Sequence, residues 1–395
     1  MKKQEKVDYK SIFDSLDQSF IEWFVGFSDA EANFQIKLNE GKVQLMFQIG
    51  LHLDDYPLLC YIKEKLQCGY ITLDHKRQKA NYVISSQEAL LGVLVPIFDS
   101  FHLNTTKYLN YIAFREVINM RTTKDHLTPK GRVRILCLKA SMNKARTEFD
   151  LSADHQVHIT WNWLLGFVEG DGSFSFSGVK PRLSIQLTLI DKPVLVAINE
   201  FFGGIGSLTI ISRSSQEGRE CHAPEVALEF RQIAFLYNVI VPTFTSLTFY
   251  SKKGLDFADW AICVRVYFSG RHTLQEGKEL IALLRSRMNN NRLSTNPDNK
   301  RDLVIPQERI DGVFNLSAPY EVRKGARDFS GSNKLVPESF PVYVSHPDGL
   351  TSLYPSLSQC ALAMGISRNP IRKYLDSGTP YNGYFFSSTP PESNS

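Results

Sequence analysis

The chain contains few cysteines, and no two of them stand close together. Six cysteines occur among 395 residues, and no CxxC pair is present. A zinc ribbon or a dithiol redox motif is therefore disfavoured, because both need closely spaced thiols. We expect buried free thiols in a reducing compartment instead. The six are Cys60, Cys68, Cys137, Cys221, Cys263 and Cys360.

Long apolar runs are also lacking. No stretch approaches the roughly 18 apolar residues that span a bilayer, so we expect no membrane segment. The first residues, MKKQEKVDYKSIFDSLD, mix acids with lysines, whereas an organelle-import helix is poor in acids and rich in arginine. We therefore expect no transit peptide, which leaves a cytoplasmic protein or one made inside the organelle where it works.

The chain also lacks a large excess of positive or negative charge. The net charge is +4, and apolar and charged residues make up 43% and 22% of the chain, which is ordinary for a globular protein of two or three domains. The small basic surplus weakly favours an anionic partner, although a solvated surface explains it as well. Composition alone does not separate a nuclease from a dehydrogenase.

What the chain does contain is a long internal repeat. The line IEWFVGFSDAEANFQI from Ile21 resembles WNWLLGFVEGDGSFSFS from Trp161. Two copies of this length indicate a duplicated domain rather than a solenoid. The matching positions are Gly26/Gly166, Pro57/Pro193 and Lys107/Lys253, followed by His126/His272, Gly131/Gly277, Asn143/Asn289 and Arg146/Arg292.

Each copy predicts a mixed α and β unit. The signature segment reads as a helix, which Asp17 or Ser19 would cap in the first copy. Alternation with a period of two follows, in FQIKLN from Phe34 and in KVQLMFQIGLHL from Lys42, and predicts strands with one apolar face. Helices are expected around 57–66, 87–98 and 107–120. This order predicts an α+β fold, a pseudo-symmetric pair of αββαββα units with helices on one face of each sheet.

The other face of these strands carries hydrogen-bond donors and acceptors. Plain solvent exposure is the commoner use of such a face, but these residue types suit base edges and phosphates. Gln48 and Ser184 hold equivalent places there and would position water. The candidate DNA contacts are Gln35, Lys37, Asn39, Gln44, Arg182 and Gln186.

The two signature helices each carry small residues four apart, Gly26 with Ala30 and Gly166 with Gly170. Such a stripe lies on one helix face and lets two backbones approach closely. Packing these helices together would bring Glu31 and Asp171 to adjoining ends. Two carboxylates are stable there only when protons or cations neutralise them, and Mg²⁺ with oxygen ligands suits phosphodiester hydrolysis. Ordinary exposed acids near helix ends are the alternative.

The repeated lysines Lys107 and Lys253 add a second pair of candidates. A lysine near the scissile phosphate stabilises the charge of the transition state or orients water. Surface lysines at helix starts are the alternative reading.

The segments FVGFSDAEA (24–32) and LLGFVEGDG (164–172) resemble the two signature motifs of a single-chain LAGLIDADG homing endonuclease. The segment DHLTPKGRVRILCLKASMNKAR also resembles the closing helix of the organellar intron-encoded group, and the resemblance covers 20–292. It implies metal-binding acids at Glu31 and Asp171, carbonyl ligands at Ala30 and Gly170, and basic active-site residues at Lys107 and Lys253.

The resemblance further implies a saddle of two sheets over a long asymmetric duplex DNA target. Both strands would be cut across the minor groove to leave 3′ overhangs, with Mg²⁺ required and Mn²⁺ as a substitute. The implied protein is a monomer made in the mitochondrion, with the plastid as alternative, whose cutting promotes mobility of its intron or element. The alternatives are an RNA-binding maturase acting on its own intron RNA and a catalytically dead DNA-binding protein.

One position departs from the family pattern. The first motif ends in Ala32-Asn33, where the second has Gly172-Ser173. If position 32 required a positive φ, alanine would be strained there by roughly 1–2 kcal/mol, and the helix end carrying Glu31 would shift.

Beyond the repeats, polar residues with glycine, proline and serine predict a linker, and the last segment reads as compact again. Strands are expected at 342–345 and 384–387, with one helix from Ser356 or Ser358 to Met364 and a second over 369–375. This segment resembles the small nuclease-associated modular domain with a helix-turn-helix core. Its candidate DNA contacts are Arg368, Asn369, Arg372 and Lys373.

The expected domain boundaries follow from these patterns. They are a tail over 1–19, repeats over 20–150 and 151–295, a linker over 296–340, the modular domain over 341–388 and a tail over 389–395.

Overall fold

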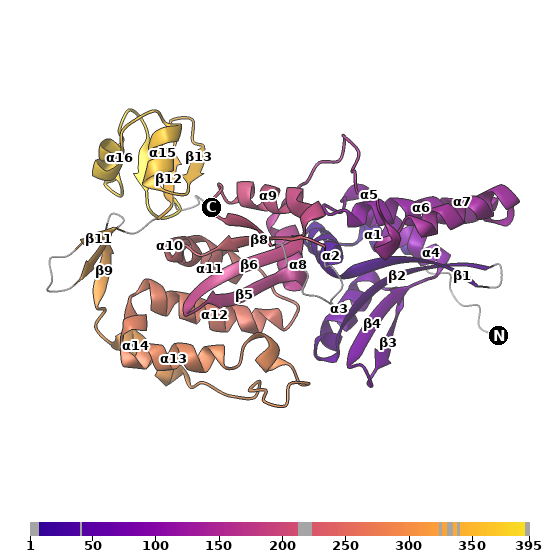
Figure 1. Ribbon diagram of the computed structural model, residues 1–395, viewed down its shortest axis with the longest axis horizontal. Helices are drawn as coiled ribbons and strands as arrows, with labels where there is room; N and C mark the ends of the chain where they lie inside the picture. The colour runs from indigo at the N-terminus through magenta and orange to yellow at the C-terminus, as the bar shows by residue number, and fades with distance from the viewer. Residues whose placement is uncertain are drawn as a thin grey trace, which may run out of the picture. The chain divides into compact units, whose positions relative to one another are not determined.

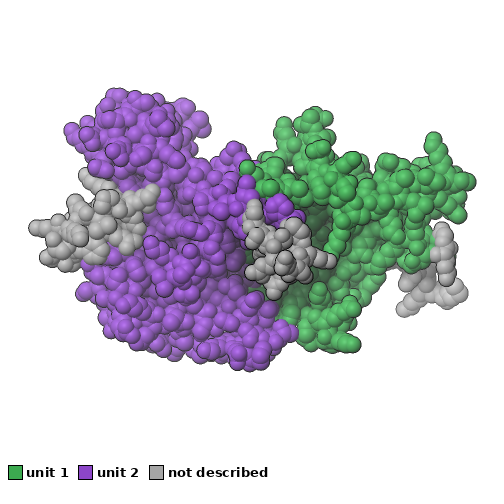
Figure 2. Space-filling view, in the orientation of Figure 1, with its two compact units in different colours: residues 1–172, 187–194, 249–252 green, residues 173–186, 195–248, 253–395 purple. Residues whose placement is uncertain are grey.

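The computed structural model describes residues 8–39, 42–211, 223–323, 326–329, 335–337 and 340–391. The chain divides into two compact units (Figure 2). The first unit holds 1–172, 187–194 and 249–252, and the second holds the remainder. The first unit therefore contains the whole first repeat and also the second signature helix.

The first repeat has the predicted element order (Figure 1). Its sheet has the strand order β1-β2-β4-β3, with antiparallel neighbours throughout. The elements are α2 (Gln18–Glu31), β1 (Ala32–Asn39), β2 (Lys42–His52), η1 (Leu53–Asp55), α3 (Tyr56–Leu66), β3 (Tyr70–Asp74), β4 (Lys79–Ile84), α4 (Gln87–Ala89), the π-helical η2 (Leu90–Leu94), α5 (Val95–Ser100), α6 (Lys107–Thr122), η3 (Asp125–Leu127), α7 (Pro129–Ala140) and η4 (Asn143–Ala145).

The apolar face of this sheet forms the core of the first unit. Phe34 of β1 and Phe47 of β2 are fully buried, and the Phe34 ring lies 5.6 Å from Phe98 of α5 and 5.4 Å from Phe114 of α6. Helices α5 and α6 thus cover one face (Figure 1), which leaves the alternate, polar positions on the other. The predicted period-two pattern is confirmed because burial alternates along β1 and the middle of β2.

The second repeat has the same order, and its sheet has the strand order β5-β6-β8-β7. Its core is built around Phe174 and Trp260, whose rings lie 5.1 Å apart. The predicted duplicated α+β architecture is thereby confirmed. The elements are α8 (Trp161–Asp171), β5 (Gly172–Ser177), β6 (Lys180–Thr188), η5 (Leu189–Asp191), α9 (Lys192–Phe201), β7 (Ser207–Ile211), β8 (Glu225–Phe230), α10 (Ile233–Phe235), η6 (Leu236–Ile240), α11 (Val241–Thr245), α12 (Lys253–Phe268), η7 (Arg271–Thr273), α13 (Gln275–Arg285) and η8 (Asn289–Arg292).

The start of the chain is more ordered than a tail. Helix α1 (Tyr9–Asp14) buries Ile12, and its N-cap Asp8 accepts from the amides of Lys10 and Ser11. A Cβ on Gly92 of η2 would lie 2.4 Å from Cβ of Tyr9, so α1 packs closely on the first repeat. The expected tail over 1–19 is therefore wrong from Tyr9 onward.

The expected linker over 296–340 is also wrong in part, because it contains helix α14 (Gln307–Asn315). Ile305, Ile310 and Val313 pack into a buried cluster with residues of α12 and α13 such as Tyr267 and Leu280. Strands β9 (Tyr320–Arg323), β10 (Ala326–Phe329) and β11 (Leu335–Pro337) then form a small antiparallel sheet in the order β11-β10-β9.

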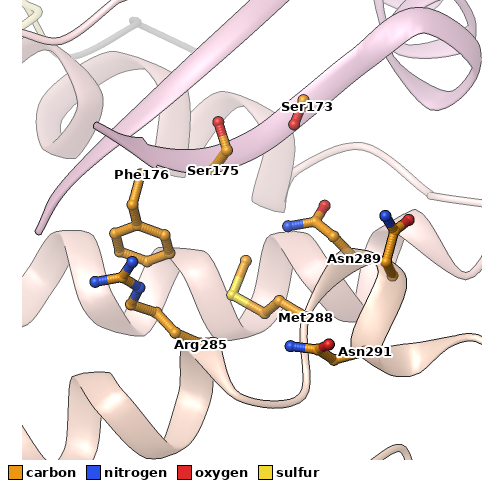
Figure 3. A pocket seen from close by; sticks show the side chains of 8 residues that line it. Ser173, Ser175, Phe176, Arg285, Met288, Asn289 and Asn291 are labelled. Carbon is orange, nitrogen blue, oxygen red and sulfur yellow. The ribbon is translucent and has the colours of Figure 1, made fainter. Parts of the chain in front are cut away.

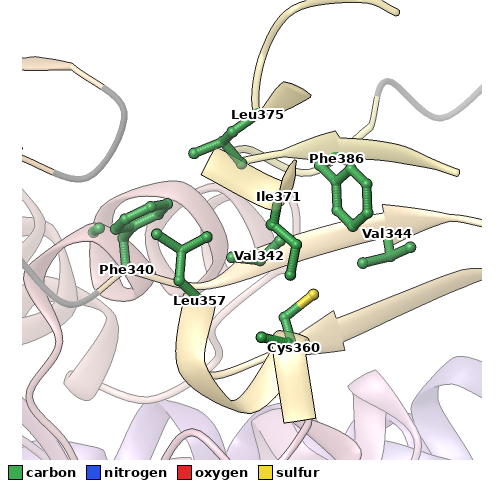
Figure 4. Close-up of a cluster of buried hydrophobic side chains, with 10 residues drawn as sticks. Phe340, Val342, Val344, Leu357, Cys360, Ile371, Leu375 and Phe386 are labelled. Carbon is green, nitrogen blue, oxygen red and sulfur yellow. The ribbon is translucent and has the colours of Figure 1, made fainter. Parts of the chain in front are cut away.

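The C-terminal segment forms a small α and β module. Its sheet has the order β13-β12-β14, from β12 (Val342–Ser345), β13 (Thr351–Tyr354) and β14 (Phe385–Ser387). Helix α15 (Leu357–Ala363) is capped by the Ser356 side chain, as predicted, and α16 (Arg368–Tyr374) follows. Figure 4 shows the shared core of these elements, with Val342, Cys360 and Ile371 fully buried.

Two expectations from composition meet the structure here. Cys68, Cys263 and Cys360 are buried free thiols as expected, whereas Cys60 is half-buried and Cys137 is exposed; Cys221 lies outside the described residues. Within the described ranges, no helix has the length and apolar character needed to cross a membrane.

Candidate active site

The two signature helices pack against each other through their glycines. A Cβ on Gly26 would lie 2.0 Å from the carbonyl oxygen of Trp163, and one on Gly166 would lie 2.1 Å from that of Trp23. Real Cβ atoms do not approach backbone this closely, so glycine is required at both positions. The predicted close approach of α2 and α8 is confirmed.

The same approach brings the C-terminal ends of the two helices together. At Gly170 a Cβ would lie 2.2 Å from Cβ of Ala30 and 3.2 Å from Cγ of Glu31. The Glu31 side chain therefore lies against the last turn of α8, whose final residue is Asp171. Both acids are half-buried at these ends.

Alanine is not strained at the end of the first motif. Ala32 has φ −78° and ψ 153°, and Gly172 has φ −78° and ψ 157°. These are extended conformations that any residue adopts. The helix-to-strand transition is thus the same in both copies, and the concern that alanine displaces Glu31 is removed.

Lys107, the first residue of α6, places its ammonium group at this helix end. Its Nζ donates to the carbonyl oxygens of Ser28 at 3.1 Å and Ala30 at 2.9 Å. Burial lowers the pKa of Lys107, while the charges of Asp29, Asp171, Glu31 and Asp191 act in the opposite direction. Acids from both signature helices therefore act on one half-buried cation.

Lys253 holds the equivalent place in the second copy, as the first residue of α12. It belongs to the second unit, and it directly follows the segment 249–252 of the first.

The oxygen donors at the helix ends fit a hard divalent cation. Within the described residues no three His, Cys, Asp or Glu side chains gather into a complete metal site. Mg²⁺ is commonly held by one or two carboxylates together with substrate phosphates and water, and Glu31 and Asp171 supply that number. The carbonyl oxygen of Ala30 already accepts from Lys107, so it would have to serve both groups.

Two buried acids near the site escaped the sequence analysis. Asp29 and Glu169 each stand two residues before a motif acid and are 3% and 4% exposed. Burial raises the pKa of each carboxyl, and the hydrogen bonds each accepts partly offset this effect. The signal that could have found them is the repeat itself, which keeps an acid at this position in both copies.

The polar face of the first sheet contains a chain of hydrogen-bonded amides. Gln35 donates to Gln48 at 3.1 Å, and Gln48 donates to Asn81 of β4 at 2.7 Å. The alternating pattern predicts Gln35 and Gln48 on this face, whereas Asn81 was not predicted because its strand lacks a clear alternating pattern. Lys37, Asn39 and Gln44 are exposed on the same two strands.

In the second sheet the expected DNA contacts are held by acids of β8. Arg182 pairs with Glu229 and also donates to Ser175 at 3.1 Å, while Gln186 donates to Glu225 at 2.8 Å. Ser184 is half-buried between them on β6. These pairs join β6 to β8 across the polar face of the sheet.

A polar cavity of about 490 Å³ lies beside the first strand of this sheet (Figure 3). Ser173 and Ser175 of β5 line one side, and the segment after α13 lines the other with Asn289 and Asn291. Asn289 is fixed there because its side chain donates to the Phe174 carbonyl at 3.2 Å. Hydroxyl, amide and guanidinium groups thus converge at the edge of the second sheet.

Comparison with known proteins identifies this arrangement. The family model described as LAGLIDADG endonuclease matches residues 24–118 and 164–264. A probable intron-encoded DNA endonuclease aI1 of Mycosarcoma maydis is 37% identical over 91 residues, which cover 23% of this chain and 75% of that protein. The chain belongs to the LAGLIDADG endonuclease family.

The relatives that match this LAGLIDADG protein over a longer stretch are less identical to it in sequence. An uncharacterized mitochondrial protein RF1 of Saccharomyces cerevisiae is 24% identical over 389 residues, covering 92% of this chain and 80% of that one. A probable intron-encoded endonuclease 3 of Neurospora crassa is 26% identical, and there the match covers 66% of this chain but only 53% of the relative.

The fold is shared with solved homing endonucleases. The I-SmaMI LAGLIDADG homing endonuclease bound to cleaved DNA is similar with a TM-score of 0.60 and 24% identity, over 71% of this chain and 99% of that chain. The same meganuclease bound to uncleavable DNA with a TTGT central four gives a TM-score of 0.61 and 26% identity, over 69% of this chain and 98% of that chain.

Proposed function

We propose that this chain is a site-specific double-strand DNA endonuclease, which hydrolyses phosphodiester bonds with Mg²⁺ at a long asymmetric target and so promotes the mobility of its intron or element. The observation that carries the proposal is the close packing of the ends of α2 and α8, which bear Glu31 and Asp171, with the Lys107 ammonium on the Ala30 carbonyl at the same end. The two acids would hold a divalent cation, and that cation together with the lysine ammonium would stabilise the negative charge that develops during phosphodiester hydrolysis.

The roles of the residues follow from their chemistry. Glu31 and Asp171, with the carbonyl groups of Ala30 and Gly170, would hold Mg²⁺, for which Mn²⁺ would substitute. When bound, the metal lowers the pKa of a water molecule and stabilises the leaving oxygen. Lys107 and Lys253 would stabilise the negative charge on the phosphoryl oxygens, and Gln48 and Ser184 would orient the attacking water.

Hydrolysis would form one bond from phosphorus to water and break one bond from phosphorus to the sugar. The water oxygen would attack phosphorus and lose a proton to solvent, the bond from phosphorus to the leaving sugar oxygen would break, and that oxygen would take up a proton from solvent to become a hydroxyl. One such event on each strand produces the double-strand cut.

The polar sheet faces are the proposed DNA interface. Their side chains are donors and acceptors that reach base edges or phosphates, and the polar cavity in Figure 3 extends the same surface at the edge of β5. The interface comprises Gln35, Lys37, Asn39, Gln44, Arg182 and Gln186, with Arg368, Asn369, Arg372 and Lys373 of the C-terminal module as a second contact.

The remaining expectations belong to the same proposal. Both motifs stand in one chain, so a monomer suffices for two cuts. We place the protein in the mitochondrion, because a relative is named mitochondrial, with the plastid as alternative. The acids at the helix ends favour cleavage over the RNA-binding maturase alternative, since gripping intron RNA requires no carboxylate pair.

The test is Mg²⁺-dependent cleavage of a randomised duplex library by the wild-type chain and by Glu31→Gln and Asp171→Asn. We expect the wild type to select and cut one target, and each variant to bind that target but lose double-strand cleavage. Glu308→Gln is the matched control, because Glu308 is an exposed acid on α14. Cleavage by both motif variants at the wild-type rate would refute the catalytic assignment.

A further inference from the structure

Asp29 and Glu169 each accept hydrogen bonds from the segment that precedes one of the two repeated lysines. Each is buried and stands two residues before a motif acid in the sequence. Each also makes contacts that the proposed catalytic roles do not use. Their partners follow one pattern in both copies of the repeat.

Asp29 fixes the turn that leads into Lys107. Its carboxylate accepts from the amide of Asn104 at 2.8 Å, from the amide of Thr105 at 3.0 Å and from the Thr105 hydroxyl at 2.6 Å. The Thr105 hydroxyl oxygen in turn lies 3.3 Å from the amide nitrogen of Lys107, which donates to it. One carboxylate therefore ties α2 to the start of α6.

Glu169 does the same for the turn that leads into Lys253. It accepts from the amides of Tyr250 at 2.9 Å and Ser251 at 2.6 Å, and from the Ser251 hydroxyl at 2.7 Å. Ser251 stands two residues before Lys253, as Thr105 stands two residues before Lys107.

Each carboxylate is also held by the opposite signature helix. The Trp163 indole nitrogen donates to Asp29 at 3.0 Å, and that of Trp23 donates to Glu169 at 2.6 Å. Each acid therefore cannot swing away without breaking a hydrogen bond to the opposite signature helix.

A second pair of acids holds the same turns from another side. The amide of Thr106 donates to Asp191 at 2.7 Å, and the amide of Lys252 donates to Asp55 at 3.2 Å. Both turns are thus fixed at three consecutive residues, which restrains the backbone directly before each lysine.

We infer that Asp29 and Glu169 are positioning residues, each holding one lysine for the cleavage of one DNA strand. The inference rests on the proposed nuclease function. A displacement of about 1 Å costs up to about 100-fold in rate, so loosening one turn would slow one strand cut and leave the other. A general loss of structure would slow both alike.

The experiment measures the rate of cutting of each strand on a supercoiled plasmid carrying the target, where a single cut gives the nicked form and two cuts give the linear form. Labelled duplexes identify which strand is nicked. The variants are Asp29→Asn and Glu169→Gln, with Lys107→Ala and Lys253→Ala as references. We expect Asp29→Asn to spare the strand that Lys107→Ala spares, and Glu169→Gln to match Lys253→Ala, with the ratio of strand rates changed about 10-fold.

Milder variants keep the test decisive if the acid variants fold poorly. Thr105→Val and Ser251→Ala remove only one donor to each carboxylate and should shift the strand ratio in the same directions. Glu22→Gln is the matched control, since Glu22 is a buried acid of α2 that accepts from Gln18, Thr160 and Asn162, none of which lies on either turn.

The outcomes separate the two proposals. Absence of cutting by the wild type would sink the nuclease function itself. Cutting by the wild type, with strand ratios in folded Asp29 and Thr105 variants equal to that of Glu22→Gln, would overturn the positioning role. So would lysine variants that slow both strands equally.

Discussion

At the residue scale, the two repeats differ in how they fix the segment after their last long helix. In the second repeat the Arg292 side chain is 8% exposed, and it donates to Asp256 at 2.7 Å and to Asp259 at 2.6 Å. In the first repeat Arg146 donates instead to the neutral Asn110 at 3.2 Å. The same connection is thus charged and buried in one copy and neutral and half-exposed in the other.

This difference predicts unequal costs for matched variants. Arg292→Ala strips a buried carboxylate of its guanidinium partner and should lower the free energy of unfolding by about 3–5 kcal/mol. Arg146→Ala removes a bond to an amide and should cost about 1 kcal/mol. Urea denaturation of the two variants measures both values, and equal losses would contradict the assignment.

The sequence predicts the functional residues that occur in both copies of the repeat. It does not predict residues whose role depends on a contact with a neighbouring strand. Gly26 and Gly166 were found as a stripe of small residues, and the structure shows why they are needed. Glu229 and Asn81 could not be found, because each matters only as a partner of a residue on a neighbouring strand. Strand order and register, which create these pairs, are not written in the local sequence.

At the element scale, periodicity predicted the strands and most helices but failed for α14. The segment around Gln307–Asn315 is short and polar, and its few apolar residues are Ile310, Val313 and Phe314. These few apolar residues are sufficient to hold the helix in place, because α12 and α13 provide an apolar surface for it to pack on. That surface includes Tyr267, Leu280 and Leu284. In the first repeat the position of Leu280 is held by Arg134, which pairs with Glu116, so this part of the apolar surface is replaced by an ion pair.

The contribution of α14 packing to stability can be tested by truncating the central buried side chain of this helix. Ile310 is 7% exposed, and Ile310→Ala should destabilise the second unit by about 2–5 kcal/mol because it leaves a cavity between α14 and α13. Val304 is 80% exposed on the same segment, so Val304→Ala should stay within about 0.5 kcal/mol. Chemical denaturation measures both. A loss of under about 1 kcal/mol for Ile310→Ala would show that α14 is only loosely attached.

At the scale of the whole molecule, the C-terminal module is docked onto the second repeat and is not a domain on a free tether. Ala234 of α10 is buried in the core cluster of the module, and Phe268 of α12 packs against it. Gln232 donates to the carbonyl oxygen of Pro355 at 3.1 Å. A docked module offers its helix α16 at a fixed place, whereas a tethered one would add only effective concentration.

The basic residues of α16 allow this second contact to be measured without removing the module. Arg368, Arg372 and Lys373 are exposed, while Ile371 of the same helix is buried in the module core. Each phosphate contact with duplex DNA contributes about 0.9 to the slope of log affinity against log salt concentration. Replacing the three basic residues by alanine should therefore lower that slope by up to about 2.7 and weaken binding, with little effect on folding.

The matched control replaces Lys130, Arg132 and Lys139 of α7, which are equally exposed and lie on a helix that packs on the helical side of the first sheet. Binding titrations over roughly 50–200 mM salt distinguish the two, and a slope that falls equally for both triple variants would mean that α16 makes no specific contact with the target.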